Sequence, residues 1–349
     1  FDLVRVTSSD DFIEDQEAAL ARIEAGQMEG LHWFTKSRVI RGTTPQELLP
    51  GARSIICLGI SYLHQEDASG ESLDRLVSAG KVARYAWVKD YHRVMKRRMR
   101  DFVSGLEASL KSSISARWYV DDGPMLDRAA AARSGLGWFG KNTNILTSSH
   151  GSWVFLGQVI TNLDLDADAP LKKSCGSCVR CIDKCPTGAI VAPYVLDNTR
   201  CISYLTIENR GAIPINLRPL MQNWVFGCDI CQDVCPVNRK AEAPGIPVPL
   251  PINEGPAAIH GLLQLVELLE MTESEFKSRF QGTSVMRAKH VGMQRNACVA
   301  LGNLGDVKAI PSLCRALWHS TSLVRGHAAW ALGQIGTPEA LEALAKAES

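Results

Sequence analysis

Eight of the eleven cysteines lie between residues 175 and 235, in two closely spaced runs and one single position. The first run is Cys175-x2-Cys178-x2-Cys181-x3-Cys185, followed by Pro186. The second run is Cys228-x2-Cys231-x3-Cys235, followed by Pro236, and Cys201 stands between the two. Thiolates at these spacings can fold a short loop around an iron–sulfur cubane. The pattern therefore predicts two [4Fe–4S] clusters, which together form an electron relay.

The first run has the pattern of bacterial ferredoxins, in which the fourth cysteine of each run ligates the other cluster. That rule predicts one cluster held by Cys175, Cys178, Cys181 and Cys235. It predicts a second cluster held by Cys185, Cys201, Cys228 and Cys231, with Cys201 replacing the first cysteine that the second run lacks. Two structural zinc sites are the alternative, although a tetrahedral zinc site does not require three close cysteines followed by Cys-Pro. The other cysteines, Cys57, Cys298 and Cys314, lie in apolar stretches and are expected to be buried thiols.

The residues before the clusters should contain the group that receives the electrons. Short apolar runs predict buried strands, and the stretches between them predict helices. The strands are expected at 54–60, 117–120 and 152–160, and the helices at 10–29, 90–111 and 125–134. This alternation predicts an α/β domain with a largely buried sheet. Because ligands gather outside the carboxyl ends of strands in α/β sheets, Asp121 and Asp122 are placed at a candidate site.

A glycine-rich loop, Gly135-Leu-Gly-Trp-Phe-Gly-Lys141, matches two nucleotide-binding patterns by spacing alone. Both patterns require a loop that follows a strand and opens a helix. Here a helical stretch precedes the loop, a predicted strand over 142–147 follows it, and Asn142 stands where a phosphate-binding loop has Ser or Thr. We therefore expect no NAD or ATP site. The favoured interpretation is a close approach of the backbone to another ligand, and a structural turn is the alternative.

The C-terminal residues repeat with a period of 31, so that Ala297, Leu301 and Gly305 return as Ala328, Leu332 and Gly336. Each copy predicts a helix, a glycine stop and a second helix, as in HEAT-like repeats. Two copies cannot form a long solenoid and must pack on the preceding domain. Residues 243–251 are proline-rich and predict a linker.

Charge and composition exclude several classes of protein. The chain has 46% hydrophobic and 21% charged residues, which is normal for a folded soluble protein. Its 38 basic and 37 acidic residues nearly cancel, so a nucleic-acid surface must be a local patch. Basic residues concentrate in 89–100 and 277–295, and Arg315, Arg325 and His327 could extend the second patch. No apolar run reaches the ~20 residues of a membrane helix, and no secretion signal is evident, so a cytoplasmic monomer is expected.

Several motifs together resemble one family, the epoxyqueuosine reductases, which are cobalamin-dependent iron–sulfur enzymes of tRNA modification. The motifs are the cysteine set, Ala83-Arg-Tyr85, Asp90-Tyr-His92, Val120-Asp-Asp-Gly-Pro124, Gly135-Leu-Gly-Trp-Phe-Gly-Lys-Asn142 and Gly151-Ser-Trp-Val-Phe-Leu-Gly157. The resemblance covers nearly the whole chain. It implies reduction of the epoxide on the modified wobble base of a tRNA anticodon stem-loop to the alkene of queuosine, with loss of water.

The same resemblance implies the cofactors and the acid. Cobalamin is expected in the N-terminal domain beside one cluster, and the sequence has no D-x-H-x-x-G motif to supply a histidine ligand to cobalt. The family's proton donor matches Asp121. A carboxyl group donates near neutral pH only when burial or nearby charge raises its pKa. Asp122 departs from the small or polar residue of the family pattern, which leaves the choice between the two carboxylates open. Alternatively, Asp121 caps the helix expected near Met125.

Further contacts follow from the resemblance as expectations. Arg84, Lys141 and Asn142 are candidates for the amides or tail of the corrin. Arg93, Lys96, Arg97 and the stretch 277–295 are candidates for tRNA phosphates, and each has a structural alternative as a solvated or packed surface residue. An external electron donor of the flavodoxin or ferredoxin type is expected.

The predicted architecture has three domains. Residues 1–165 form an α/β cobalamin and substrate domain resembling flavin reductases and reductive dehalogenases. Residues 166–245 form a ferredoxin-like domain with both clusters, and residues 246–349 a linker and a HEAT-like helical domain for tRNA recognition. Three other functions remain open: a corrinoid iron–sulfur reductase of small molecules, an electron-transfer protein, and an RNA-binding module with structural clusters. A tRNA enzyme binds an anticodon stem-loop, whereas a reductase of small molecules does not. An electron-transfer protein would have clusters but no bound corrinoid.

Overall fold

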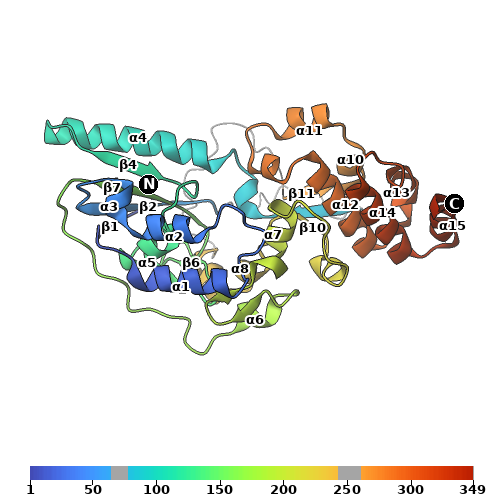
Figure 1. Cartoon of the computed structure of the whole chain (residues 1–349), viewed down its shortest axis with the longest axis horizontal. Helices are drawn as coiled ribbons and strands as arrows, with labels where there is room; N and C mark the ends of the chain where they lie inside the picture. Colours follow the sequence, from blue (N-terminus) through green and yellow to red (C-terminus); the bar gives the residue numbers. More distant parts are fainter. Residues whose placement is uncertain (64–77, 243–260, 349) are drawn as a thin grey trace.

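The structure, a computed structural model, describes residues 1–63, 78–242 and 261–348 of the chain. A sheet with flanking helices at the N-terminal end leads into a region of short helices and hairpins and then into a helical bundle (Figure 1). The linker predicted at 243–251 lies outside the described residues. Within those residues, no helix is both long and apolar enough to cross a membrane.

The main sheet has four strands in the order β1-β2-β7-β4, and every neighbouring pair is antiparallel. Their bounds are β1 Leu3–Ser8, β2 Ser54–Ser61, β7 Val154–Thr161 and β4 Ala116–Tyr119. The three expected strands are confirmed, and β1 is an addition. The rule about carboxyl ends belongs to parallel sheets, so it does not apply to this sheet. Because β2 and β4 both run opposite to β7, however, their carboxyl ends share one edge, where Asp121 and Tyr62 lie.

Helices bury both faces of this sheet, as the apolar strands predict. On one face, Val94, Met95, Met99 and Val103 of α4 (Tyr91–Leu110) pack on strand residues that include Leu58. Gly157 permits this approach, since a Cβ there would lie 3.1 Å from both Met95 Cε and Met99 Sδ. On the other face lies α5 (Asp127–Arg133), whose alanines pack on β2 and β7. The N-terminal helices are α1 Ile13–Glu24, α2 Lys36–Thr43 and α3 Pro45–Leu48.

The glycine-rich loop is a structural turn that leads into a small hairpin of β5 (Trp138–Phe139) and β6 (Ile145–Leu146). A Cβ at Gly135, where φ is +72°, would lie 2.3 Å from the carbonyl oxygen of Ala169. A Cβ at Gly137 would lie 2.5 Å from that of Leu146. The glycines are needed because the chain packs on itself here, so the structure favours the structural alternative over a ligand.

A second sheet joins the three predicted domains, because each contributes one strand. β3 (Ala79–Val82) pairs in parallel with β10 (Trp224–Phe226) and antiparallel with β11 (Leu262–Gln264). A Cβ at Gly80 would lie 2.6 Å from side-chain atoms of Val225 and Leu265. This close packing fixes the cysteine region and the C-terminal helices against the N-terminal sheet.

The cysteine region consists of short elements. They are α6 Arg180–Lys184, β8 Ile190–Ala192, β9 Val195–Leu196, η3 Asn198–Arg200, α7 Ile202–Ile207, η4 Arg218–Met221, α8 Ile230–Asp233 and α9 Pro236–Ala241; η2 (Arg84–Ala86) lies earlier in the chain. α6 packs against α8, so the two cysteine runs lie next to each other.

The C-terminal repeat is confirmed. Its first copy is α12 (His290–Leu304) and α13 (Ile310–Ala316), and its second is α14 (Ser322–Ile335) and α15 (Pro338–Glu348). α12 and α14 end at Gly305 and Gly336 with φ of +64° and +65°, the left-handed C-cap that glycine favours. The preceding elements are α10 Leu265–Glu270, α11 Glu273–Phe280 and η5 Ser284–Ala288, and η6 (Val307–Ala309) precedes α13. α12 packs on α7 and β10, so the repeats lie against the preceding domain, as predicted.

Two of the basic residues predicted to face RNA are buried instead. Arg295 is 1% exposed and donates hydrogen bonds to the carbonyl oxygens of Leu205, Asn209 and Gly211. His327 is also 1% exposed, and burial lowers its pKa to about 4, which keeps it neutral. The prediction was wrong for these two residues because a charge count along the sequence does not show which helix face is packed.

Candidate active site

The cysteines expected to hold the first cluster lie together. Burial raises the pKa of Cys181, and the neighbouring Cys175 and Cys235 raise it further. Burial likewise raises the pKa of Cys235, with Cys175 and Cys178 as close neighbours. Residues around the first run, such as Lys173 and Gly176, are exposed, so this site lies near the surface.

The cysteines expected to hold the second cluster form a separate, more deeply buried group. Burial raises the pKa of Cys228 well above its usual value, with Cys231 and Cys201 contributing. Burial also raises the pKa of Cys201, and Cys185 adds to the effect. Cys181 of the first group also raises the pKa of Cys231, so the two sites adjoin. The observed neighbours are those of the predicted exchange between runs, and the individual ligand assignments stay predictions.

The zinc alternative requires a tight tetrahedral group of ligands around one ion. Among the described residues, no three Cys, His, Asp or Glu side chains form a group that could hold a single metal ion. None of the eight cysteines of the two groups forms a disulfide, so all of them are available as ligands.

A cavity of about 750 Å³ lies between the three regions of the fold. All four cysteines predicted for the second cluster line it, and none of the four predicted for the first. Asp121 lines the same cavity, and so do Tyr62, Tyr85 and Tyr91. The cavity therefore brings the candidate acid and the buried cysteine group to one space, with flat aromatic rings on its walls.

Asp121 occupies a tight turn directly after β4. Its φ is +53°, in the left-handed region, and its backbone N–H donates to Asp127 Oδ1 at 3.3 Å. Tyr91 Oη donates to Asp121 Oδ2 at 2.9 Å. Burial, and then the charge of Asp121, raises the pKa of Tyr91 well above its usual value, so this hydroxyl stays a donor. The turn and the hydrogen bond together hold the Asp121 carboxyl at the cavity, but Asp121 is exposed, so the chain by itself does not bury this carboxyl as expected of a proton donor.

The structure also bears on the two alternatives, that Asp122 is the acid and that Asp121 caps a helix. Asp122 forms an ion pair with Lys96 and accepts a hydrogen bond from Val120 N at 3.1 Å, and it does not line the cavity. α5 begins at Asp127 after an N-cap at Leu126 that has no side-chain cap, so Asp121 does not cap that helix. The geometry favours Asp121 over Asp122 as the acid.

Asp127 is a second carboxyl close to Asp121, and its role is not evident from the sequence. Burial, and then the charge of Asp121, raises its pKa to about 7. The sequence likewise gives no role for Tyr91, which it contains only as part of the motif Asp90-Tyr-His92 at the start of α4. Asp90 caps that helix by accepting from His92 N at 3.1 Å, which explains the spacing of the motif and turns Tyr91 toward Asp121.

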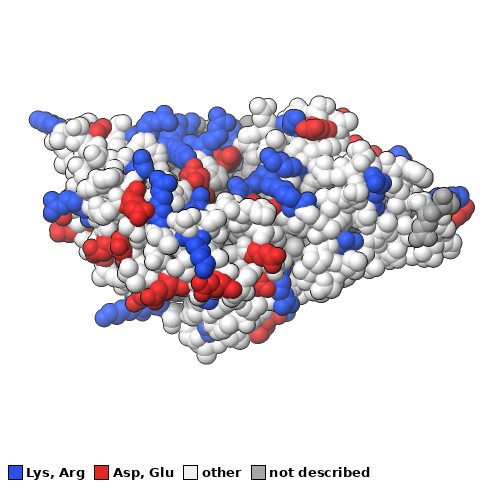
Figure 2. Space-filling view, viewed as in Figure 1, with Lys and Arg blue, Asp and Glu red and all other residues white. Residues whose placement is uncertain are grey.

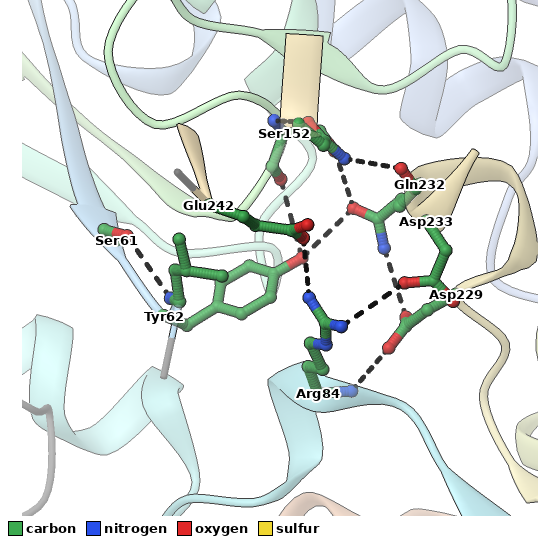
Figure 3. Close-up of polar contacts among 10 residues, drawn as sticks. Ser61, Tyr62, Arg84, Ser152, Asp229, Gln232, Asp233 and Glu242 are labelled. Carbon is green, nitrogen blue, oxygen red and sulfur yellow. Dashed lines mark hydrogen bonds and ion pairs between the residues drawn. The ribbon is translucent and has the colours of Figure 1, made fainter. Parts of the chain in front are cut away.

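In the wall of the cavity, a buried polar network ties the second cysteine run to the N-terminal region (Figure 3). Gln232 Oε1 accepts hydrogen bonds from Tyr62 Oη at 3.2 Å and from Ser152 Oγ at 2.9 Å. Gln232 Nε2 donates to Asp229 Oδ1 at 3.1 Å, and Asp229 Oδ2 accepts from the Arg84 backbone N–H at 2.7 Å. The loop between Cys228 and Cys235 is thus fixed by groups from distant parts of the chain.

The three residues expected at the corrin have different surroundings. The Arg84 guanidinium pairs with Glu242 at 2.7 Å and with Asp233 at 3.6 Å, and its centre lies 4.6 Å from the Trp153 ring. Lys141 is buried and donates to the carbonyl oxygen of Gly176 at 2.7 Å. Neither of the two lines the cavity. Asn142 does, and it donates to the carbonyl oxygen of Cys231 at 3.3 Å.

Two buried polar atoms of the cavity wall lack a hydrogen-bond partner among the described residues. They are Asn198 Nδ2 and Ser284 Oγ. A buried donor without a partner is costly, so these atoms indicate a ligand that carries hydrogen-bond acceptors. Amide carbonyls around an otherwise flat ring would fit a wall of this composition, with the tyrosines against the ring.

The basic residues proposed for RNA lie partly on the surface. Lys and Arg side chains gather over α4 on the face shown in Figure 2. Arg93 and Arg97 are exposed, whereas Lys96 is paired with Asp122. In the second stretch, Lys277, Arg279 and Arg287 pair with Glu273, Glu267 and Glu208. Apart from Arg295, these residues can still be reached from solvent.

Comparison with known families defines the class of this protein. A model of the 4Fe-4S double cluster binding domain matches residues 174–238, which contain all eight grouped cysteines. A HEAT-repeat model matches residues 284–348, and a model described as epoxyqueuosine reductase QueG, DUF1730, matches residues 43–122. The chain is therefore an iron–sulfur protein with a double-cluster domain and C-terminal HEAT repeats.

Similarity to individual proteins narrows the class. The epoxyqueuosine reductase of Xanthomonas campestris is 38% identical over 326 residues, which cover 93% of this chain and 89% of that protein. The chain belongs to the epoxyqueuosine reductase family, whose members are oxidoreductases. A solved epoxyqueuosine reductase with an epoxyqueuosine-modified tRNA-Tyr stem loop has a TM-score of 0.88 at 34% identity, covering 99% of this chain and 89% of its own. A structure from Bacillus subtilis, described with its catalytic aspartate loop swung out of the active site, has a TM-score of 0.87 at 34% identity, covering 99% and 90%.

Proposed function

We propose that this protein reduces epoxyqueuosine in the anticodon loop of tRNA to queuosine, with Asp121 as the proton donor and with cobalamin in the cavity. The observation that carries the proposal is the cavity itself. It is lined both by the four cysteines of the buried group and by Asp121. Electrons and a proton can therefore reach one substrate in one cavity.

The electron path follows from the depth of the two cysteine groups. The first group lies near the surface, where an external donor of the flavodoxin or ferredoxin type can reach it. The second group lines the cavity. Electrons would enter at the cluster held by Cys175, Cys178, Cys181 and Cys235. They would leave from the cluster held by Cys185, Cys201, Cys228 and Cys231.

Bound cobalamin would supply the reducing centre that accepts these electrons one at a time and passes them to the epoxide. Asn198 Nδ2, Ser284 Oγ and Asn142 are the groups of this chain that would hold its amides, and the tyrosine rings would exclude water from its face. Arg84 and Lys141 act instead through the loops that they hold, since neither lines the cavity.

The reaction consumes two electrons and two protons, and it releases the epoxide oxygen as water. As the C–O bond opens, Asp121 would give one proton to that oxygen, for which the two groups must come within ~3 Å, and the second proton would come from solvent water. Tyr91 holds Oδ2 of Asp121 by its hydrogen bond, which leaves Oδ1 to carry the proton. The left-handed turn at Asp121 aims the carboxyl into the cavity.

The solved relative with a modified tRNA stem loop supports RNA as the substrate. Exposed arginines of α4 and of the 277–295 stretch would contact phosphates. The affinity for a stem-loop should then fall steeply with salt. A corrinoid reductase of small molecules would have the same clusters but would not bind the stem-loop.

The test combines spectroscopy with one substitution. Anaerobically reconstituted protein should show the absorption of iron–sulfur clusters and of a bound corrinoid in one visible spectrum. Asp121→Asn should keep that spectrum and bind the stem-loop, yet fail to form queuosine, whereas Asp122→Asn should retain turnover. A colourless, iron-free protein would refute the cofactor assignment, and full activity of Asp121→Asn would remove Asp121 from the mechanism.

A further inference from the structure

One large aromatic side chain of the cavity wall stands in solvent. Trp33, in the loop between α1 and α2, lines the cavity and yet is 43% exposed. A wall residue with this exposure marks the place where the cavity opens to the surface. An apolar ring of this size at a cavity mouth is available to a ligand that enters.

The loop that carries Trp33 is fixed rather than free. The backbone N–H of Asn198 donates to the carbonyl oxygen of Gln27 at 2.8 Å. At Gly30 the chain lies so close to Tyr204 that a Cβ would fall 1.7 Å from its hydroxyl oxygen. Phe34 packs edge-on against the Trp33 ring, with centroids 5.7 Å apart. The loop that carries the indole is therefore ordered before any ligand arrives, which lowers the entropy cost of binding.

One cation lies against this ring, and others line the same cavity. The guanidinium carbon of Arg38 lies 5.1 Å from the centroid of the Trp33 ring, and Arg38 also donates to the carbonyl oxygen of Gly123, two residues after Asp121. Arg287 and Lys289, on the C-terminal side of the fold, line the same cavity and are exposed. An aromatic ring beside a cation, at the mouth of a cavity that further cations line, is an arrangement on which unpaired nucleobases stack while their phosphates are neutralised.

We propose that Trp33 is a stacking platform for an unpaired nucleobase of the RNA loop, next to the nucleoside that enters the cavity. This inference rests on the proposed function, because it takes RNA as the substrate. Arg38 links the platform to the turn that carries Asp121, so the stacked base and the catalytic carboxyl share one rigid frame. The alternative is that Trp33 only completes the packing of its loop.

The test measures the affinity of the cluster-loaded protein for a tRNA-Tyr anticodon stem-loop by fluorescence anisotropy. Trp33→Ala should raise Kd between about 5- and 150-fold, the range expected for loss of one base–aromatic stack. Trp33→Phe keeps an aromatic face and should stay within about 3-fold of the unsubstituted protein. Tyr194→Ala is the matched control, since Tyr194 is an aromatic residue that is 41% exposed, lies outside the proposed RNA-contacting segments and does not line the cavity; it should leave Kd unchanged.

Two further measurements separate stacking from other roles. Loss of a stack should leave the slope of log Kd against log salt unchanged, because no phosphate contact is removed. A series of stem-loops, each lacking one base of the loop, identifies the stacked base. Removing that base should weaken binding to the unsubstituted protein as much as Trp33→Ala weakens binding to the intact stem-loop. Removing it should cause no further loss of affinity in Trp33→Ala.

The outcomes also separate this inference from the proposed function. Three outcomes would overturn the stacking platform alone. They are an unchanged affinity of Trp33→Ala, a loss in Trp33→Phe equal to that in Trp33→Ala, and a loss in Trp33→Ala that is additive with the removal of each base in the series. No binding of the stem-loop by the unsubstituted protein would overturn the platform and the proposed function together. The visible spectrum of each variant checks that its clusters, and hence its fold, are intact.

Discussion

Replacing Asp127 by Asn should change how the stability of this protein depends on pH. Burial and the nearby charge of Asp121 raise the pKa of Asp127 from 3.8 to about 7. Between these two values the folded protein holds a proton at Asp127 that the unfolded chain releases. The free energy of unfolding must therefore fall as pH rises across this window. Asn cannot titrate, and it retains an oxygen that can accept from the Asp121 N–H, so the variant should lack this fall.

The size of the effect follows from the pKa difference. One pH unit corresponds to about 1.4 kcal/mol, so the contribution is at most about 4 kcal/mol. About half of it, or about 2 kcal/mol, falls between pH 5.5 and 8, where clusters can be kept intact. Asp127 keeps some solvent access, so these values are upper limits. For a chain of this length they correspond to a shift in Tm of a few degrees.

The assay is anaerobic scanning calorimetry at several pH values between 5.5 and 8. The Tm of Asp127→Asn should rise relative to that of the unsubstituted protein as pH rises. Glu17→Gln, which alters an exposed carboxylate of α1, should show no such change in relative Tm. The gain should shrink in an Asp121→Asn background, because one cause of the raised pKa is then absent. Melting curves that keep a constant separation across this range would show that Asp127 does not titrate there.

Three other substitutions test separate parts of the argument. Arg295→Met should destabilise the protein by about 2–4 kcal/mol, because buried carbonyl groups lose their donor, and a thermal melt that matches the unsubstituted protein would contradict this. Arg84→Leu should lower the occupancy of the second cluster, because it loosens the loop that contains Asp229 and Asp233. Iron content and the electron paramagnetic resonance of the reduced clusters measure this occupancy. Arg84→Lys should recover part of the occupancy. Cys201→Ser should reduce the iron content from about eight to about four atoms per chain, while retention of all the iron would exclude Cys201 as a ligand.

Much of the local architecture can be read from the sequence. Thiolate spacing indicates clusters because short loops leave few alternative ways to place the ligands. The 31-residue period and its glycines predict the helical repeat, since a C-cap with positive φ favours glycine at that position. Apolar runs predict the central strands because both faces of the sheet are buried.

What the tertiary structure decides is which distant residues meet. The resemblance matches the proton donor to Asp121 but leaves Asp122 open as an alternative, and only the fold pairs Asp122 with Lys96 and turns Asp121 to the cavity. Charge along the chain suggests an RNA contact at Arg295, but helix packing buries it. The difference has a physical cause. Spacing constrains contacts within a loop or a turn of helix, whereas burial, pKa and the assembly of a cavity depend on long-range packing that no single segment contains.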